Sequence, residues 1–171
     1  MKKRGQVWIE TVIYTLIALV LIGSVIAFIT PKIGEIRDKA IIEQSITTLQ
    51  NIDNAILAVV EGGPGNKRVM DLGIKRGSII INATGDNIVF EIKTDYTYSQ
   101  VDEKIDVGGI TALTEEEQSS NKVTLTSNYS NYDLTYNGNE EVKSISQAST
   151  PYKLSIENKG GTKTVVDITI S

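Results

Sequence analysis

The sequence predicts an α+β fold in which a long, hydrophobic N-terminal α-helix is followed by an all-β head, built as a sandwich or as a curled sheet. Three observations support this. Residues 11–30 contain no charged side chain, and apolar residues continue at helical spacing as far as Val60. The composition then shifts toward Thr, Ser, Asn, Tyr, Ile and Val in short alternating runs, which is typical of strands.

The uncharged run has the length of a membrane span. Residues 11–30, at about 1.5 Å per residue, give about 30 Å of helix, the thickness of the hydrocarbon layer. A basic cluster, Lys2, Lys3 and Arg4, precedes the run. Since basic residues favour the cytoplasmic side, we expect the N-terminus to lie in the cytoplasm and everything from Pro31 onward to lie outside.

The expected organisation has three parts. They are a basic leader over residues 1–5, a long helix over residues 6–61 with a membrane-embedded part (11–30) and an amphipathic part (32–60), and an extracellular head over residues 62–171.

The junction between leader and helix resembles a known processing site. The residues KKRGQVWIETVIY, starting at Lys2, resemble the class III signal peptides of type IV pilin-like proteins and are most similar to archaeal versions with a Gly-Gln junction. The resemblance implies that a prepilin peptidase cuts between Gly5 and Gln6 on the cytoplasmic face. It also implies that the hydrophobic helices then assemble into a filament core, with a pilus assembly ATPase and a platform membrane protein as partners. The resemblance is specific from Lys2 to about Pro31 and says nothing about the head.

Glu10 places a carboxylate at the mouth of the apolar run. A charge near the end of a membrane helix costs less than the roughly 2.5–3.5 kcal/mol typical of the midplane, but it still favours pairing. Cleavage would create a cation, the α-amino group of Gln6, and the resemblance implies that this amine in one subunit pairs with the carboxylate of a neighbour. Because buried pairs specify register better than they stabilise, we interpret Glu10 as setting the register of assembly. The alternative is that Glu10 only favours the helix dipole and reaches the membrane interface.

The second half of the helix is predicted to bury two surfaces. Pro31 and Gly34 predict a bend where the membrane gives way to water. Beyond them, three apolar residues share one side of the helix: Ile33, Ile36 and Ala40. Six others share a side nearly half a turn away: Ile42, Ile46, Leu49, Ile52, Ile56 and Val59. The first group would continue the face between subunits or form a small patch under a loop, and the second would pack against the head.

Glycines at 62, 63 and 65 end the helix, and about eight strands are expected after it. Residues 68–74, 78–82 and 88–93 predict a three-stranded meander, and residues 94–106 are ambiguous. Residues 108–120, with the acidic triplet Glu115 to Glu117, predict a loop with at most one helical turn. Further strands are expected at 123–126, 132–136 and 142–146, the last two joined by a hairpin turn at Asn137-Gly138-Asn139. A final hairpin joins residues 152–157 and 164–170.

The composition argues against catalysis and against nucleic-acid binding. The chain has no cysteine and no histidine, so the usual general base, the thiol nucleophile and the commonest metal ligands are missing. Its net charge of −4, which would become about −7 on loss of the leader, repels nucleic acid. We therefore expect no enzyme, no cofactor and no metal site.

Two glycosylation sequons fall in the predicted head. They begin at Asn82 and Asn128, on what would be the outer surface.

Taken together, the residues and the resemblance favour a structural subunit of an extracellular type IV pilus-like filament. Its N-terminal helix would be a membrane anchor first and a filament core afterwards, and its main partner would be other copies of itself. Two alternatives stay open: an uncleaved, single-pass, membrane-tethered domain that binds at the surface, and a pseudopilin of a secretion or uptake system.

Overall fold

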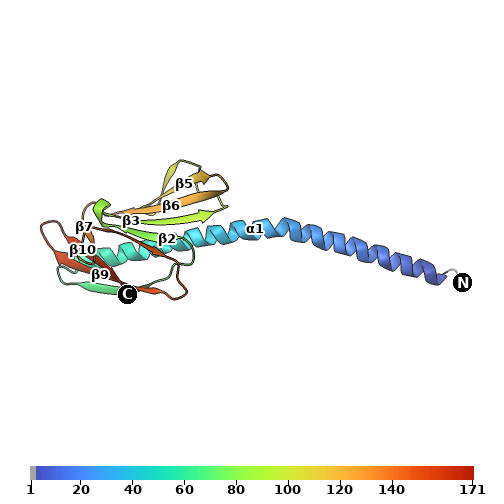
Figure 1. The fold of residues 1–171 in the computed structure, drawn as a ribbon, viewed down its shortest axis with the longest axis horizontal. Helices are drawn as coiled ribbons and strands as arrows, with labels where there is room; N and C mark the ends of the chain where they lie inside the picture. Colours follow the sequence, from blue (N-terminus) through green and yellow to red (C-terminus); the bar gives the residue numbers. More distant parts are fainter. Residues whose placement is uncertain (1–2) are drawn as a thin grey trace. The chain divides into compact units, whose positions relative to one another are not determined.

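The structure, a computed structural model, describes the backbone of residues 3–171 and the side chains of residues 7–171. One helix, α1 (Lys3–Glu61), precedes ten strands, and the fold class is the predicted α+β arrangement (Figure 1). The chain divides into two compact units that meet within α1, one ending at Arg37 and the other spanning Asp38–Ser171. The second unit contains the last part of α1 together with both sheets.

Four strands form one sheet and six form the other. The four-stranded sheet has the order β1 (Lys67–Leu72), β9 (Tyr152–Gly160), β10 (Val165–Ile170), β7 (Asp133–Tyr136). The six-stranded sheet has the order β4 (Lys104–Val107), β5 (Ile110–Glu117), β6 (Ser120–Asn128), β3 (Asn87–Thr94), β2 (Ser78–Asn82), β8 (Val142–Ser146). A 3-10 turn, η1 (Ala83–Gly85), joins β2 to β3. All neighbouring strands are antiparallel except β7 and β10, which are parallel.

The two sheets share one core with the last part of α1. The six residues predicted to face the head are at most 6% exposed: Ile42, Ile46, Leu49, Ile52, Ile56 and Val59. Ile52 meets Leu72 and Leu154 of the four-stranded sheet and Ile79 and Ile81 of the six-stranded sheet around one closed space. The prediction that this stripe packs against the head is confirmed.

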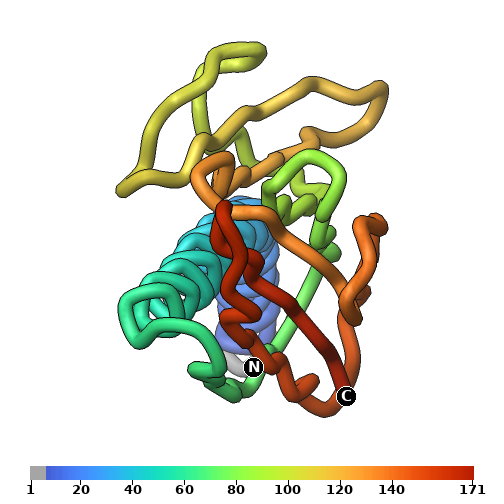
Figure 2. The backbone as a smooth tube through the Cα atoms, turned by 90° about the vertical axis from the view of Figure 1, so that its left-hand side faces the viewer, coloured from blue at the N-terminus to red at the C-terminus, as the bar shows by residue number. Residues whose placement is uncertain are grey.

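The strands do not enclose the helix. Figure 2 shows the cyan coil of α1 flanked by strands, with one side left open. Several polar residues of this part of the helix are exposed, among them Glu43, Thr47, Asn51 and Asn54. The other predicted apolar group, Ile33, Ile36 and Ala40, is exposed as well.

Polar groups hold the C-terminal end of α1. Gly62 N and Gly63 N donate to the carbonyls of Ala58 and Val60, at 3.1 Å each. Gly63 has a φ of +81°, the left-handed conformation that commonly ends a helix. Asn158, 2% exposed, donates from Nδ2 to the carbonyl of Val59 at 3.1 Å. This buried amide ties β9 to the end of α1.

One predicted loop is a strand. Residues 110–117 form β5, which pairs with β4 on one side and with β6 on the other, so the prediction of a loop at 108–120 is wrong. The acidic triplet lies at the strand's end, where Glu117 pairs with Lys93 of β3 at 2.6 Å. The small inward-facing residues Ala112 and Thr114 made the alternation hard to recognise, because an apolar period of two needs larger side chains to stand out.

Two predicted strand pairings are also corrected. β1 does not belong to a meander with β2 and β3; it pairs with β9 in the other sheet. Asn137 and Gly138 do form a tight turn, but β7 and β8 lie in different sheets and make no hairpin. The hairpins of β2 with β3 and of β9 with β10 are confirmed.

Candidate functional site: the exposed N-terminal helix

The apolar surface of the first part of α1, residues 7–30, is not covered by any part of the chain that the structure describes. Every side chain from Val7 to Thr30 is exposed, including Trp8 at 72% and Phe28 at 73%. The helix is long and apolar enough to span a membrane. It is the only helix with this property among the described residues. A soluble monomer rarely exposes such a surface, and its length and composition are compatible with a membrane span.

The serine and threonine hydroxyls on this surface are satisfied within the helix itself. Each donates to the backbone carbonyl four residues earlier: Thr11 to Val7 (2.9 Å), Thr15 to Thr11 (2.8 Å), Ser24 to Val20 (2.8 Å) and Thr30 to Ile26 (2.8 Å). Such bonds let a hydroxyl lie in an apolar medium without an external partner. The exposed run therefore presents apolar groups and internally bonded Ser and Thr hydroxyls, together with the polar groups of Trp8, Glu10 and Tyr14.

Glu10 is exposed, and it lies among large exposed apolar side chains such as Ile9 and Ile13. The predicted junction, Gly5 and Gln6, lies outside the residues whose side chains the structure describes. Cleavage there and the pairing of Glu10 with a neighbour's amine therefore remain predictions.

The predicted bend also remains a prediction. The helical hydrogen-bonding pattern continues through Pro31 and Gly34. Proline cannot donate a backbone hydrogen bond, so the helix has one bond fewer at this point. A Cβ added at Gly34 would meet no atom within 4 Å, so packing inside the chain does not require glycine there.

Charged residues resume directly after the apolar run. Lys32 and Glu35 form an ion pair of 2.9 Å on the helix surface. Both side chains are about half exposed, so the pair contributes at most about 1 kcal/mol. The pair nevertheless marks the point where charged side chains resume on the surface of α1.

Asp38, the first residue of the second unit, is a buried carboxylate that sequence patterns do not single out. It is 8% exposed. One oxygen accepts from Arg76 at 2.5 Å, and the other accepts from the Thr94 hydroxyl at 2.6 Å and from Asp95 N at 3.1 Å. Thus α1 is joined here to the β1–β2 loop and to the end of β3.

The environment of Asp38 favours its ionised form. Burial by itself would raise the pKa of the carboxyl, but the hydrogen bonds from Thr94 and Asp95 and the charge of Arg76 outweigh burial. The pKa is lowered from its usual value of 3.8. The network thus holds a charged side chain at the point where α1 joins the head.

The two sequons lie at the same end of the six-stranded sheet. Asn82 pairs with Asn87, and Asn87 pairs with Asn128, so the two sequon asparagines are separated by one strand. Asn82 is partly buried, and its Oδ1 accepts from Thr84 Oγ1 (2.7 Å) and from Gly85 N (3.1 Å). Asn128 is exposed, and its Oδ1 accepts from Ser130 N at 2.8 Å. Of the two, Asn128 is the more accessible.

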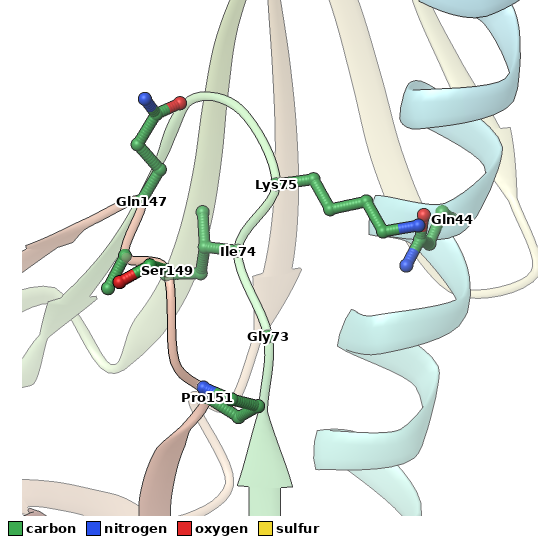
Figure 3. Close-up of a pocket in the computed structure, with 8 residues that line it drawn as sticks. Gln44, Gly73, Ile74, Lys75, Gln147, Ser149 and Pro151 are labelled. Atoms are coloured by element: carbon green, nitrogen blue, oxygen red, sulfur yellow. The ribbon is translucent and has the colours of Figure 1, made fainter.

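The head has an open hollow with a mixed polar and apolar lining. It has a volume of about 530 Å³ and lies where the segments after β1 and β8 pass between the sheets (Figure 3). Lys75 extends across it toward Gln44 of α1, and Gln147 and Ser149 lie on the other side. Its lining carries no carboxylate, and no group of three or more potential metal ligands occurs among the described residues. This hollow gives no basis for assigning a reaction.

Comparison of the chain with protein-family models, with curated proteins and with solved structures gave no match.

Proposed function

We propose that the chain is a structural subunit of an extracellular, type IV pilus-like filament. Its N-terminal helix would hold the protein in the membrane after synthesis and would form the filament core after assembly. The single observation that supports this most is the exposed apolar run from Val7 to Thr30, which precedes a unit with a core of its own. No residue of this run belongs to that core, so its surface is available for lipid and then for other copies.

The proposed assembly has three steps. A prepilin peptidase cuts between Gly5 and Gln6 on the cytoplasmic face. The helix then exchanges lipid contacts for contacts with neighbouring helices, driven by a pilus assembly ATPase and guided by a platform membrane protein. Glu10 sets the axial register by pairing with the new amine of an adjacent subunit, because a charge in an apolar medium is stable only at positions where it is paired.

The first experiment determines the N-terminal residue of the protein from native membranes and from material sheared off the cell surface. Peptide mass spectrometry should find chains that start at Gln6 in both fractions. Chains that start at Met1 and are confined to membranes would refute the proposal and favour a permanently tethered surface domain. Processed chains that never enter the sheared fraction would favour a pseudopilin, which forms short or transient filaments.

The second experiment tests the role of Glu10. The Glu10→Ala variant should be processed at the normal site but should be lost from the sheared fraction. Glu35→Ala is the matched control, since it removes an acidic residue of the same helix that lies beyond the apolar run and pairs with Lys32. If both variants assemble equally well, Glu10 does not set the register.

A further inference from the structure

The head contains a second buried carboxylate, which the proposed assembly steps do not use. Asp167 of β10 is 7% exposed, while its neighbours Val166 and Ile168 are fully buried and point to the core. Because side chains alternate along a strand, Asp167 lies on the opposite face of the sheet. Within the described chain no lysine or arginine forms an ion pair with it. Its burial therefore calls for a different explanation.

Two hydrogen bonds to the side chain of Asp167 end on one carboxylate oxygen. Oδ1 accepts from Thr135 Oγ1 at 2.8 Å and from the backbone nitrogen of Gly138 at 2.7 Å. Thr135 belongs to β7, beside Asp167 in the sheet, whereas Gly138 lies in the turn that follows β7. The carboxylate thus reaches out of its sheet to hold the backbone of a tight turn.

That turn contains the only Asn-Gly pair of the sequence, Asn137-Gly138. The two residues have φ values of +50° and +76°, and Tyr136 and Asn139 exchange backbone hydrogen bonds of 2.8 and 3.0 Å around them. This is the conformation that Asn-Gly pairs favour in two-residue turns. Asn137 is exposed to solvent.

An exposed Asn-Gly pair is chemically vulnerable. The glycine nitrogen can lose its proton and attack Cγ of the asparagine, because glycine has no Cβ to hinder the approach. The new N–Cγ bond forms as the Cγ–Nδ2 bond breaks, and Nδ2 takes up a proton and leaves as ammonia. Water then opens the five-membered imide, giving aspartate or isoaspartate. No oxidant or reductant is needed.

We infer that Asn137 is a latent deamidation site and that Asp167 protects it by holding the N–H of Gly138. The attacking atom would have to give up the proton that it donates to the carboxylate. In doing so it would become an anion 2.7 Å from an existing negative charge. Because like charges at this distance repel strongly in a partly buried site, forming the nucleophile is disfavoured. The chain thereby keeps a turn that suits its fold without the usual chemical ageing.

The test follows deamidation in the full-length protein, kept folded in detergent at mildly alkaline pH. Mass spectrometry of peptides containing residue 137 gives the fraction converted, and the same protein denatured in urea gives the unprotected rate. The native rate should be lower by at least about tenfold, judged from the Coulomb cost of two close charges. Equal rates in the native and the denatured protein would overturn the inference without any variant.

Two variants separate the carboxylate from general loosening of the turn. Asp167→Asn keeps an oxygen acceptor but removes the charge, and it should accelerate deamidation of the native protein by about tenfold or more. Thr135→Val removes the other hydrogen bond to the same oxygen and should leave the rate unchanged. Equal acceleration in both variants, or none in Asp167→Asn, would overturn the role of the carboxylate. Near-ultraviolet circular dichroism checks that each variant is folded, and if Asp167→Asn is not, the comparison of native and denatured wild type decides.

Discussion

Replacing Asp38 with alanine should destabilise the head by about 2–5 kcal/mol. The magnitude follows from the groups left behind. The Thr94 hydroxyl, 1% exposed, would lose its acceptor, which costs about 1–3 kcal/mol for a buried group. Asp95 N would lose an acceptor too, at a lower cost of about 1 kcal/mol because water can reach it. The ion pair with Arg76 adds at most about 1 kcal/mol, since Arg76 is 42% exposed.

The assay is urea unfolding of the full chain in detergent, followed by near-ultraviolet circular dichroism of the buried Tyr129 and Tyr136. With a slope of about 2 kcal/mol per molar urea, the expected loss moves the midpoint by about 1–2.5 M. Asp71→Ala is the matched control, because Asp71 and its partner Lys153 are both 61% exposed. Its loss should stay within about 1 kcal/mol. An Asp38→Ala variant no less stable than Asp71→Ala would refute the reasoning.

The same variant gives a test by pH. Because the pKa of Asp38 is lower in the folded head than its usual 3.8, the folded state favours the carboxylate. Its contribution to stability is therefore complete well above pH 3.8 and is lost as the pH falls through the folded-state pKa. The difference between wild type and Asp38→Ala should shrink across that acidic range. A difference that stays constant down to the folded-state pKa would contradict the assignment.

Three further predictions concern the core, the helix end and the surface. Ile52→Ala should lower the free energy of unfolding in urea by about 2–5 kcal/mol because Ile52 is 1% exposed. Leu57→Ala is the control: Leu57 is 40% exposed on the same helix, and its loss should cost under about 1 kcal/mol. Equal losses would contradict the placement of the core. Asn158→Ala should cost about 1–3 kcal/mol, since a buried carbonyl of α1 loses its donor; full stability would mean that this bond does not anchor the helix. In the native host, intact-mass spectrometry should find a glycan that disappears in Asn128→Gln and persists in Asn82→Gln; the bare polypeptide mass would refute it.

The sequence predicts the helical part of the fold well because its signal is local. Six apolar residues at helical spacing from Ile42 to Val59 lie within four or five turns, and all are buried. The end of the helix follows from Gly62 and Gly63 for the same reason. Here, neighbours in the chain are neighbours in space, so periodicity alone identifies the face.

The sheets were predicted less well because strand pairing is not local. β1 pairs with β9, for example Lys67 with Glu157, and no sequence pattern in either strand identifies its partner. The strand from Ile110 was missed because acidic residues at its end resemble a solvated loop. Those charges are compatible with a strand because Lys122 of the adjacent strand β6 lies opposite Glu115, and Lys93 of β3, one strand further, pairs with Glu117.

The role of Asp38 could not have been predicted either. Its partners Arg76 and Thr94 are 38 and 56 residues away along the chain. An aspartate flanked by Arg37 and Lys39 is indistinguishable in sequence from an ordinary solvated helix residue. Glu10, by contrast, stands out because every neighbour is uncharged, so its unusual setting is visible without a structure.

The internal hydrogen bonds of Thr11, Thr15, Ser24 and Thr30 make these hydroxyls independent of the surrounding medium. Because they are bonded within the helix, the helix can move from one apolar medium to another without exchanging these hydrogen bonds. Between lipid tails and neighbouring helices the hydrophobic effect is also nearly balanced, so close packing decides the direction of transfer. A helix of this kind can therefore pass from lipid to contact with protein without leaving its Ser and Thr hydroxyls unsatisfied.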